Sequence, residues 1–538
     1  MTDAEIAPRE VTPPPLQAPT AKEKKYDRQL RLWAASGQRA LEESHVLLVV
    51  GDEPQGSNSS VAGVEALKNL ILPSIGNFTI ADSAKVTDAD LGVNFFLETD
   101  SLHKSRAEET KHLLSELNPD VTGHAITAPL AEWLPVEGSL TPYNLVLICA
   151  PIQPEILQRI SSYATERSIP IISIQSAGFY GSFSIQLPHE FPIVDTHPDP
   201  ESTQDLHLLA PWSELESAID SLGDLSALSD HDHGHIPYIL LLLYYLREWK
   251  SSHNGSYPST FKEKTEFREL VRSGARTNSP EGGEENYDEA CAAVLKSIGP
   301  PPVGSGCKEM MSMPTCTDLK TESANFWVIA HAIKTFYDAH GVLPLPGSLP
   351  DMKATSSEYI RLQGLYKAKA RADVAEVAKT VRQLEGSLSR STRIEDSEIE
   401  AFCKNASHVR VLTNPNNERV PSLRLATSDA KTLARLPSLV ENDWEGMFAV
   451  FVALNANINP ENPIDVTTLS SDAETQENYT NAITEVERVS GGELHNISSV
   501  LGGMVAQEAI KLLTRQYVPV DGTCVFDGIR SKTGVFKI

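Results

Sequence analysis

The sequence predicts an α/β fold, in which a doubly wound, mostly parallel sheet is interrupted by a large, mainly helical insertion. Short apolar runs alternate with helical periodicity up to about residue 188, as expected when buried parallel strands are joined by helices. The same pattern returns in the last fifty residues, which are too few to form a core alone. We therefore expect the two ends of the chain to complete one sheet.

The N-terminal part of this sheet is expected to follow strand–helix alternation. Continuous apolar runs such as 45–50 indicate strands that are buried on both faces, and apolar residues three and four apart indicate helices. In chain order, the predicted elements are a helix at 24–41, a strand at 45–50, a helix at 61–72, a strand at 78–81, a helix at 106–117, a strand at 144–150, a helix at 155–166 and a strand at 169–174.

The remaining chain is divided by composition. The proline-rich start predicts a disordered tail at 1–23. The α/β part then covers 24–188, a helical insertion 189–490, and the returning part 491–538. Helices are predicted within the insertion at 236–250, 260–273, 325–339, 357–388 and 440–456. The returning part is predicted to hold a helix at 497–513 and strands at 523–527 and 532–538.

Composition excludes several classes of protein. The formal net charge is 46 − 72 = −26, which argues against a nucleic-acid or anionic-membrane binder and favours a partner with a basic surface. Six cysteines lie far apart without a CxxC pair, as is typical of reduced thiols in a cytoplasmic or nuclear protein. The first twenty residues lack the features of a secretory signal, and the most apolar run, 236–246, is too short to span a bilayer.

Several segments resemble a known family. Five of them are similar to ubiquitin-activating-type enzymes, whose fold is ThiF-type and Rossmann-like: Lys25–Trp33, Glu65–Pro73, Ile75–Asp82, Asn94–Leu97 and Leu501–Lys511. Inside the insertion, Tyr257–Arg272, Leu349–Met352 and Tyr359–Gln363 resemble the regulatory (amyloid-precursor-protein-binding) subunits of the neddylation (Rub) pathway. The resemblance runs from about residue 24 to the end of the chain.

This resemblance implies a regulatory, non-catalytic subunit. Its partner would be a homologous catalytic subunit that binds ATP and Mg and activates the ubiquitin-like modifier of the neddylation pathway. The insertion would take the place of a catalytic-cysteine domain and form one wall of the groove for modifier or thioester transfer. A conjugating enzyme is a further partner that the resemblance allows. A cytoplasmic or nuclear location, with no nucleic-acid or membrane partner, fits this role.

The positions that would bind a nucleotide are altered. The loop Gly51–Gly63 carries Asp52 and Glu53, which would repel phosphates, and it lacks a clean GxGxxG pattern. Asp82 follows a predicted strand and is either a ribose acceptor or, as we favour, the cap of a turn. Where active family members carry Asn-Arg-Gln, this chain has residues 92–94, Gly-Val-Asn; Arg106 replaces a family lysine. We therefore expect no bound cofactor and no adenylation by this chain.

Two further motifs favour structural interpretations. The Pro-Thr-Cys-Thr segment around Cys316 resembles the surroundings of the family's nucleophile but lacks a downstream proline, so we expect no nucleophile here and no catalytic residue in this chain. His231, His233 and His235 alternate in a way that could bind a metal. Because Pro237 and a helix follow directly, we interpret this run as a helix entry and expect no metal site.

Arg28 is the candidate residue for chemistry in trans. In the resemblance, the matching arginine of one subunit reaches the ATP held by the other, where a planar, permanently charged side chain stabilises phosphate. The alternative is an ion pair within the chain, because Asp27 and Glu23 are close. Arg31 is a weaker candidate, with a structural role favoured.

Other functions are kept as alternatives. The chain could be an autonomous adenylating enzyme, if the Gly51–Gly63 loop held ATP, or the equivalent subunit for another ubiquitin-like modifier. A dinucleotide-dependent oxidoreductase would need a proper GxGxxG and a hydride-side catalytic residue, and the sequence shows neither.

Overall fold

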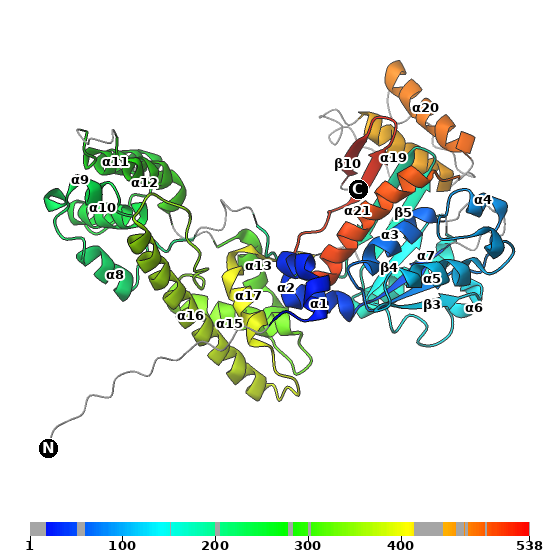
Figure 1. Ribbon diagram of the computed structural model, residues 1–538, viewed down its shortest axis with the longest axis horizontal. Coiled ribbons are helices and arrows are strands. Elements are labelled where there is room, and N and C mark those ends of the chain that lie inside the picture. Colours follow the sequence, from blue (N-terminus) through cyan, green and yellow to red (C-terminus); the bar gives the residue numbers. More distant parts are fainter. Residues whose placement is uncertain are drawn as a thin grey trace.

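The computed structural model describes residues 18–50, 60–150, 152–198, 205–277, 283–299, 303–413, 445–458, 467, 472–489 and 492–536. Figure 1 shows an α/β lobe, which contains both the early and the last part of the chain, and a helical arm that extends from it. The predicted α/β fold class with a large helical insertion is confirmed.

The lobe is built on an eight-stranded sheet with the order β10-β9-β6-β5-β4-β1-β2-β3. The first five strands in sequence run parallel, and β6, β9 and β10 are added antiparallel. The last two strands complete the sheet as predicted, because β9 pairs with β6 and β10 pairs with β9. The strands are β1 (His45–Val49), β2 (Asn77–Ala81), β3 (Thr122–Ile126), β4 (Leu145–Cys149), β5 (Ile171–Ala177), β6 (Tyr180–Gln186), β9 (Thr523–Asp527) and β10 (Lys532–Phe536).

Helices cover both faces of this sheet because alternate strand residues point to opposite sides. Val46 and Leu48 of β1 join the core beneath α3 (Val61–Ile71), α5 (Arg106–Glu116) and α21 (His495–Thr514). Leu47 and Val49 join the core beneath α6 (Leu130–Trp133) and α7 (Pro154–Arg167). α21 lies close against α3 because Gly502 has no side chain; a Cβ there would lie 2.6 Å from the Cβ of Glu65.

The arm contains two helical cores joined by one long helix. α16 contributes Leu362 and Tyr366 to the outer core and Val377 and Val381 to the inner one. The arm helices are α8 (Ser213–Asp220), α9 (Asp230–His233), α10 (Tyr238–Ser252), α11 (Phe261–Ser273), α12 (Glu285–Ser297), α13 (Ser305–Ser312), α14 (Pro314–Thr317), α15 (Asn325–His340), α16 (Ser356–Ser387) and α17 (Asp396–Lys404).

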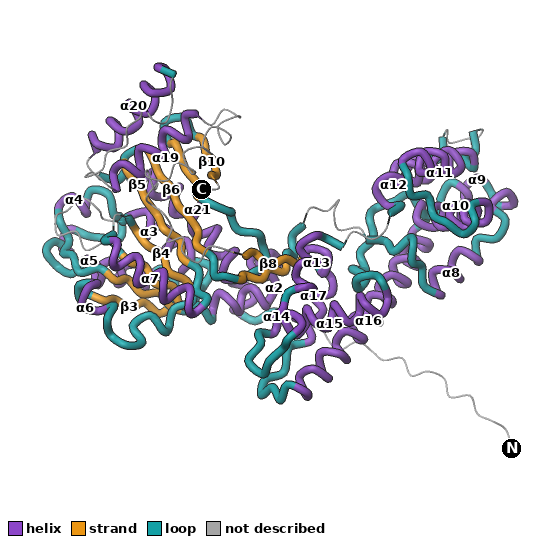
Figure 2. Tube along the Cα trace, turned by 180° about the vertical axis from the view of Figure 1, so that it is seen from behind, coloured by secondary structure: helices purple, strands orange, loops and turns teal. Residues whose placement is uncertain are grey.

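A small two-stranded sheet joins the arm to the lobe. β7 (Glu190–Val194) pairs with β8 (Val409–Thr413), and Figure 2 shows β8 between the large sheet and the arm. Phe191 of β7 is buried in the core of the lobe, and Arg39 forms an ion pair with Glu395 of the arm at 2.6 Å. The arm is therefore attached through strand pairing, packing and charge together.

The start of the described chain corrects one prediction. Helix α1 (Ala21–Lys25) includes three residues that we had assigned to the disordered tail. The reason is a capping box, in which Thr20 and Glu23 bond each other's backbone N–H groups. The predicted single helix is also divided: α2 (Asp27–Glu42) begins after Tyr26 and is kinked at Trp33 and Ala34. Residues 1–17 lie outside the described residues.

Two helices that we had placed in the insertion pack on the lobe. α19 (Glu445–Ile458) and α20 (Ala473–Val489) form a core with Ala177, Tyr180 and Val525 of the sheet. α19 is apolar on nearly all sides, and the sheet supplies the surface that buries it. We therefore propose that the insertion ends before α19 and not at 490, while its start near 189 stays a prediction.

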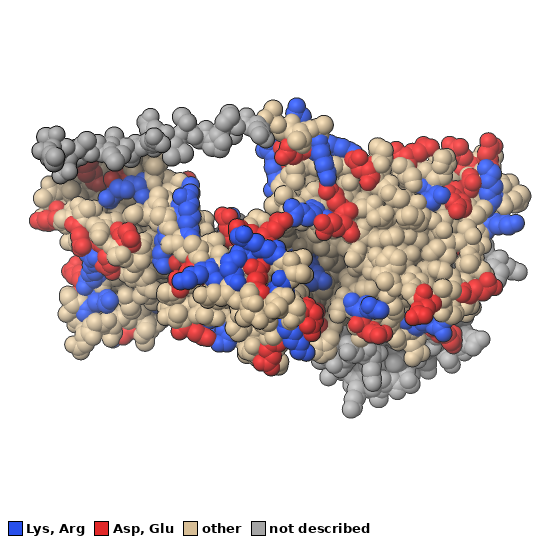
Figure 3. Space-filling view, turned by 90° about the horizontal axis from the view of Figure 1, so that it is seen from below, with Lys and Arg blue, Asp and Glu red and all other residues tan. Residues whose placement is uncertain are grey.

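The surface charge can be followed on one face of the molecule. Figure 3 shows Lys and Arg side chains intermixed with Asp and Glu on the face seen from below, so the negative charge is not concentrated in one patch there. Among the described helices, none combines the length and the apolarity that crossing a membrane requires.

Candidate functional site

The candidate site lies at the carboxyl ends of the parallel strands. β1 pairs with β2 on one side and with β4 on the other, so the strand order reverses direction at β1. Sheets of this kind bind nucleotides in the crevice at that reversal, usually with the phosphates at the N-terminus of the following helix. In this chain that helix is α3.

The predicted phosphate loop is described only at its end. Residues 51–59, which include Asp52 and Glu53, lie outside the described residues. Ser60 precedes α3 in the left-handed conformation with a φ of 49°. Gly63 faces Cys149 at the end of β4, and a Cβ there would lie 2.5 Å from the Cys149 Sγ. Burial raises the pKa of the Cys149 thiol to about 12, so the thiol stays protonated at neutral pH.

A carboxylate of the chain itself lies at the N-terminus of α3. The Val61 N–H donates to Glu493 Oε2 at 2.7 Å, and the Ser498 hydroxyl donates to Glu493 Oε1 at 3.3 Å. Glu493 is 7% exposed. We had not singled out Glu493 from the sequence. It is 432 residues from Val61 in the sequence. The one sequence feature that pointed to it is its position just before the predicted helix at 497–513, which contains the family-like segment.

Asp82 and Arg106 form a buried ion pair at the end of β2. Arg106 donates from Nε at 2.6 Å and from Nη2 at 3.2 Å to the two oxygens of Asp82, and from Nη1 at 3.0 Å to Asp90. Burial disfavours the Arg106 charge, but the two carboxylates outweigh it and raise the Arg106 pKa. Asp82 also accepts from the Ala84 N–H at 2.9 Å. Its oxygens are thus engaged within the chain, in agreement with the turn-capping interpretation.

The third altered position follows α4 (Asp88–Leu91). Asn94 is buried, and its side-chain oxygen accepts from the Phe96 N–H at 2.9 Å. The Val93 carbonyl accepts from His495 Nδ1 at 2.9 Å, and the His495 ring stacks on Phe95. The segment that returns from the helical part therefore contacts this position as well as α3.

Arg28 lies on the first turn of α2, where its side chain is exposed. It forms no hydrogen bond or ion pair with any residue that the structure describes. The two acids that could have paired with it are engaged elsewhere. Asp27 pairs with Arg31 at 3.0 Å, and Glu23 accepts from the Thr20 N–H at 2.7 Å. Arg31 thus has the structural partner we favoured for it, while the role of Arg28 stays a prediction.

Cys316 lies in α14 with no exposed surface. Burial raises the pKa of its thiol to about 11, against a weaker opposite effect of Lys334. Its carbonyl accepts a hydrogen bond from His331 Nδ1 at 2.8 Å, which fixes the backbone of α14. A nucleophile needs a lowered thiol pKa and access, and Cys316 has neither.

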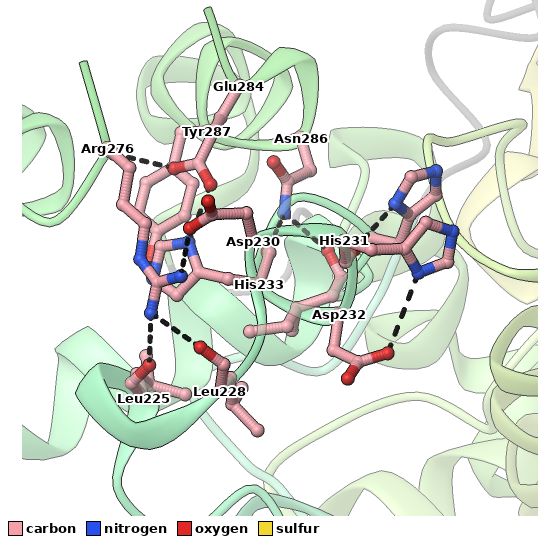
Figure 4. A network of polar contacts seen from close by, with 12 residues as sticks. Leu225, Leu228, Asp230, His231, Asp232, His233, Arg276, Glu284, Asn286 and Tyr287 are labelled. Carbon is pink, nitrogen blue, oxygen red and sulfur yellow. Dashed lines mark hydrogen bonds and ion pairs between the residues drawn. The ribbon is translucent and has the colours of Figure 1, made fainter. Parts of the chain in front are cut away.

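The three histidines do not converge. Figure 4 shows His233 turned toward Glu284 and Tyr287, with His231 on the other side of the helix. His233 Nδ1 lies 2.7 Å from Glu284 Oε1, and its Nε2 lies 3.1 Å from the Tyr287 hydroxyl. His231 and His235 stack on each other at the surface. The described residues include no metal-binding group of His, Cys, Asp or Glu, and the run forms the short helix α9 that precedes α10, as the helix-entry interpretation predicted.

Comparison with known proteins covers nearly the whole chain. The model of the ThiF family matches residues 26–538. The NEDD8-activating enzyme E1 regulatory subunit of Xenopus laevis is 34% identical over 96% of this chain and 99% of its own length. That of Danio rerio is 32% identical, with the same coverage of both chains. The subunit AXR1 of Arabidopsis thaliana is 31% identical over 96% of both chains.

Proposed function

The chain belongs to the ThiF family and, within it, to the regulatory subunits of NEDD8-activating enzymes; from this we propose that it completes the adenylation site of a catalytic partner. One observation carries the assignment. The similarity extends over 96% of the chain and 99% of the Xenopus laevis relative, so it includes the helical arm as well as the sheet. The chain is a regulatory subunit and not an enzyme on its own.

We propose that ATP and Mg bind to the catalytic partner and not to this chain. The charged groups Asp82, Asp90 and Arg106 at the carboxyl edge of this sheet support the proposal, because they are engaged with one another. Asp82 and Asp90 neutralise Arg106, which would otherwise be available to a phosphate. Breaking this buried pair so that Arg106 could bind a nucleotide would be costly, because losing one partner of such a pair costs about 3–5 kcal/mol.

Arg28 is the residue through which this chain would act on the partner's ATP. It is exposed, and no acid among the described residues pairs with it, since the neighbouring Asp27 pairs with Arg31. A guanidinium is planar and can donate hydrogen bonds to two phosphate oxygens at once. Supplied from a second subunit, it stabilises the negative charge that develops as pyrophosphate leaves.

The arm would serve as a structural counterpart of a catalytic-cysteine domain. Cys316 is fully buried and its thiol pKa is raised, which fits a thioester formed on the partner alone. We propose that the arm forms one wall of the groove for the ubiquitin-like modifier and its transfer to a conjugating enzyme. A cytoplasmic or nuclear location is part of the same proposal.

The test is modifier-dependent ATP–pyrophosphate exchange. It compares this chain alone, the catalytic partner alone, both together, and both with Arg28→Ala; Arg31→Ala is the matched control because Arg31 lies one turn away and is already paired. We expect exchange only in the mixture, reduced by Arg28→Ala and retained by Arg31→Ala.

Three other outcomes would contradict parts of the proposal. Exchange by this chain alone would make it an autonomous adenylating enzyme. Full exchange with another ubiquitin-like modifier, but not with the modifier of the neddylation pathway, would reassign the pathway. Equal loss with Arg28→Ala and Arg31→Ala would remove the special role of Arg28.

A further inference from the structure

The N-terminus of α3 is occupied by an anion that the chain itself provides. The first N–H groups of a helix have no partner within it, and with the helix dipole they attract negative charge. Here the Val61 N–H is bonded to Glu493 Oε2 at 2.7 Å. In folds of this class a nucleotide phosphate binds at that place. The Glu493 carboxylate therefore lies where a phosphate would bind.

Glu493 is held in place by three parts of the lobe. The Gly178 N–H, at the turn between β5 and β6, donates to the Gly492 carbonyl at 2.9 Å, and residues 178 and 493 form a parallel bridge. The Ser498 hydroxyl on the first turn of α21 donates to the other Glu493 oxygen. The carboxylate is therefore fixed by its own backbone and by a side chain, in addition to α3.

The same segment covers the neighbouring position of the edge. His495 Nδ1 donates to the Val93 carbonyl at 2.9 Å, and the His495 ring stacks on Phe95. Two polar groups at this edge, Ser60 Oγ and Asn94 Nδ2, are buried and lack a hydrogen-bond partner among the described residues. These groups could donate to an anion that enters once the Glu493 carboxylate is removed.

We propose that Glu493 is an internal substitute for a nucleotide phosphate, which closes the sheet edge to ligands and ties the end of the helical part to α3. This rests on the proposed function, because it takes the edge as the place where a catalytic relative would hold its nucleotide. The proposal goes beyond the proposed function because it names Glu493 as the group that occupies the phosphate position of this edge.

The experiment measures thermal unfolding of the full-length chain with and without inorganic phosphate, using potassium chloride of equal ionic strength as the reference. For Glu493→Ala we expect a melting temperature about 3–6 °C below that of the wild type. Adding about 50 mM phosphate should recover at least half of that loss, because an anion that binds only the folded state stabilises it. The wild type should show no such recovery.

Two further variants distinguish charge from packing. Glu493→Gln keeps an acceptor oxygen for the Val61 N–H but no charge, so it should melt between the wild type and Glu493→Ala and respond little to phosphate. Glu485→Ala is the matched control, because Glu485 pairs with Arg488 on α20. It should change the melting temperature by less than about 1 °C and show no phosphate response.

Several results would overturn the proposal. One is a Glu493→Ala protein that melts like the wild type. Another is a destabilised Glu493→Ala protein without a specific response to phosphate, since Glu493 would then be a structural acceptor only. If Glu493→Ala does not fold, equal melting of Glu493→Gln and the wild type would be decisive against it. None of these measurements uses the partner or ATP, so their failure would leave modifier-dependent exchange by the heterodimer intact.

Discussion

The carboxyl edge of the sheet and the first turn of α2 each carry an arginine, but the two arginines are used differently. Arg106 is buried and donates to Asp82 and Asp90. Arg28 is exposed, and its neighbour Asp27 pairs with Arg31. Charge that is neutralised within the chain stabilises the fold, whereas charge left without a partner at the surface is available to another molecule. Under the proposed function, Arg106 would stabilise this chain's own fold while Arg28 would serve the partner's site.

The largest effect is expected where the buried charge is broken. Arg106→Leu leaves two buried carboxylates without their cation, and we expect it to lower the free energy of unfolding of the lobe by about 3–5 kcal/mol. Urea denaturation followed by tryptophan fluorescence measures this. Arg31→Leu is the control, because an exposed pair contributes at most about 0.5–1 kcal/mol. If both variants lost a similar free energy of unfolding, the buried arginine would not differ from the exposed pair in its contribution to stability.

The opposite result is expected for Arg28. Arg28→Ala should leave the melting temperature unchanged while lowering exchange by the heterodimer on the order of 10³-fold, the lower end of the range for arginines supplied in trans. Arg28→Lys should recover only part of the rate, because an ammonium cannot form the bidentate contact. A full recovery by lysine would mean that Arg28 acts through net charge and not through geometry.

The sequence predicted the lobe well because its signals are local. Apolar runs predicted β1, β2 and β4, and the helices α3, α5 and α7 were predicted within a few residues. β3 was missed because Thr122–Ile126 contains glycine, histidine and few apolar residues. α19 was predicted as a helix but assigned to the insertion, since its burial against Tyr180 and Val525 depends on the tertiary structure.

The candidate site was predictable only in part. Asp82, residues 92–94 and Arg106 could be found because they occupy motif positions, and their replacement chemistry could be judged from residue type. Their actual partners could not, because the Asp82–Arg106 pair spans 24 residues and the Val61–Glu493 bond spans 432. A motif shows where a ligand would bind, but not which distant side chain has taken its place.

A pH titration extends the comparison to the amino edge of the sheet. His45 at the start of β1 lies beside Thr79 and His124, and burial followed by repulsion from His124 lowers its pKa to about 4. The unfolded chain binds this proton near pH 6.5. Stability from the neutral ring is therefore present above pH 6.5 and lost as the pH falls toward 4.

His45→Gln should flatten that part of the pH dependence. We expect a difference of roughly 1 kcal/mol between the two proteins across this range, less than full burial would give because the His45 side chain is only partly buried. Urea unfolding at pH 7 and at pH 4.5 measures it. His112→Gln, at an exposed position, is the control. A pH dependence that is the same for the wild type and His45→Gln would show that carboxylates alone account for the loss.

The smallest effect is expected at Cys316, the position that most resembles a catalytic one. With a pKa of about 11, roughly one thiol in a thousand is ionised at pH 8, and its surface is fully covered. Cys316→Ala should change neither the exchange rate nor thioester formation by the heterodimer by more than about twofold. Iodoacetamide should label Cys316 only after unfolding, as read by mass spectrometry. Rapid labelling of the folded chain, or loss of thioester with Cys316→Ala, would place a second reactive thiol in the arm. Either result would contradict the proposal that the arm supports transfer while the partner alone forms the thioester.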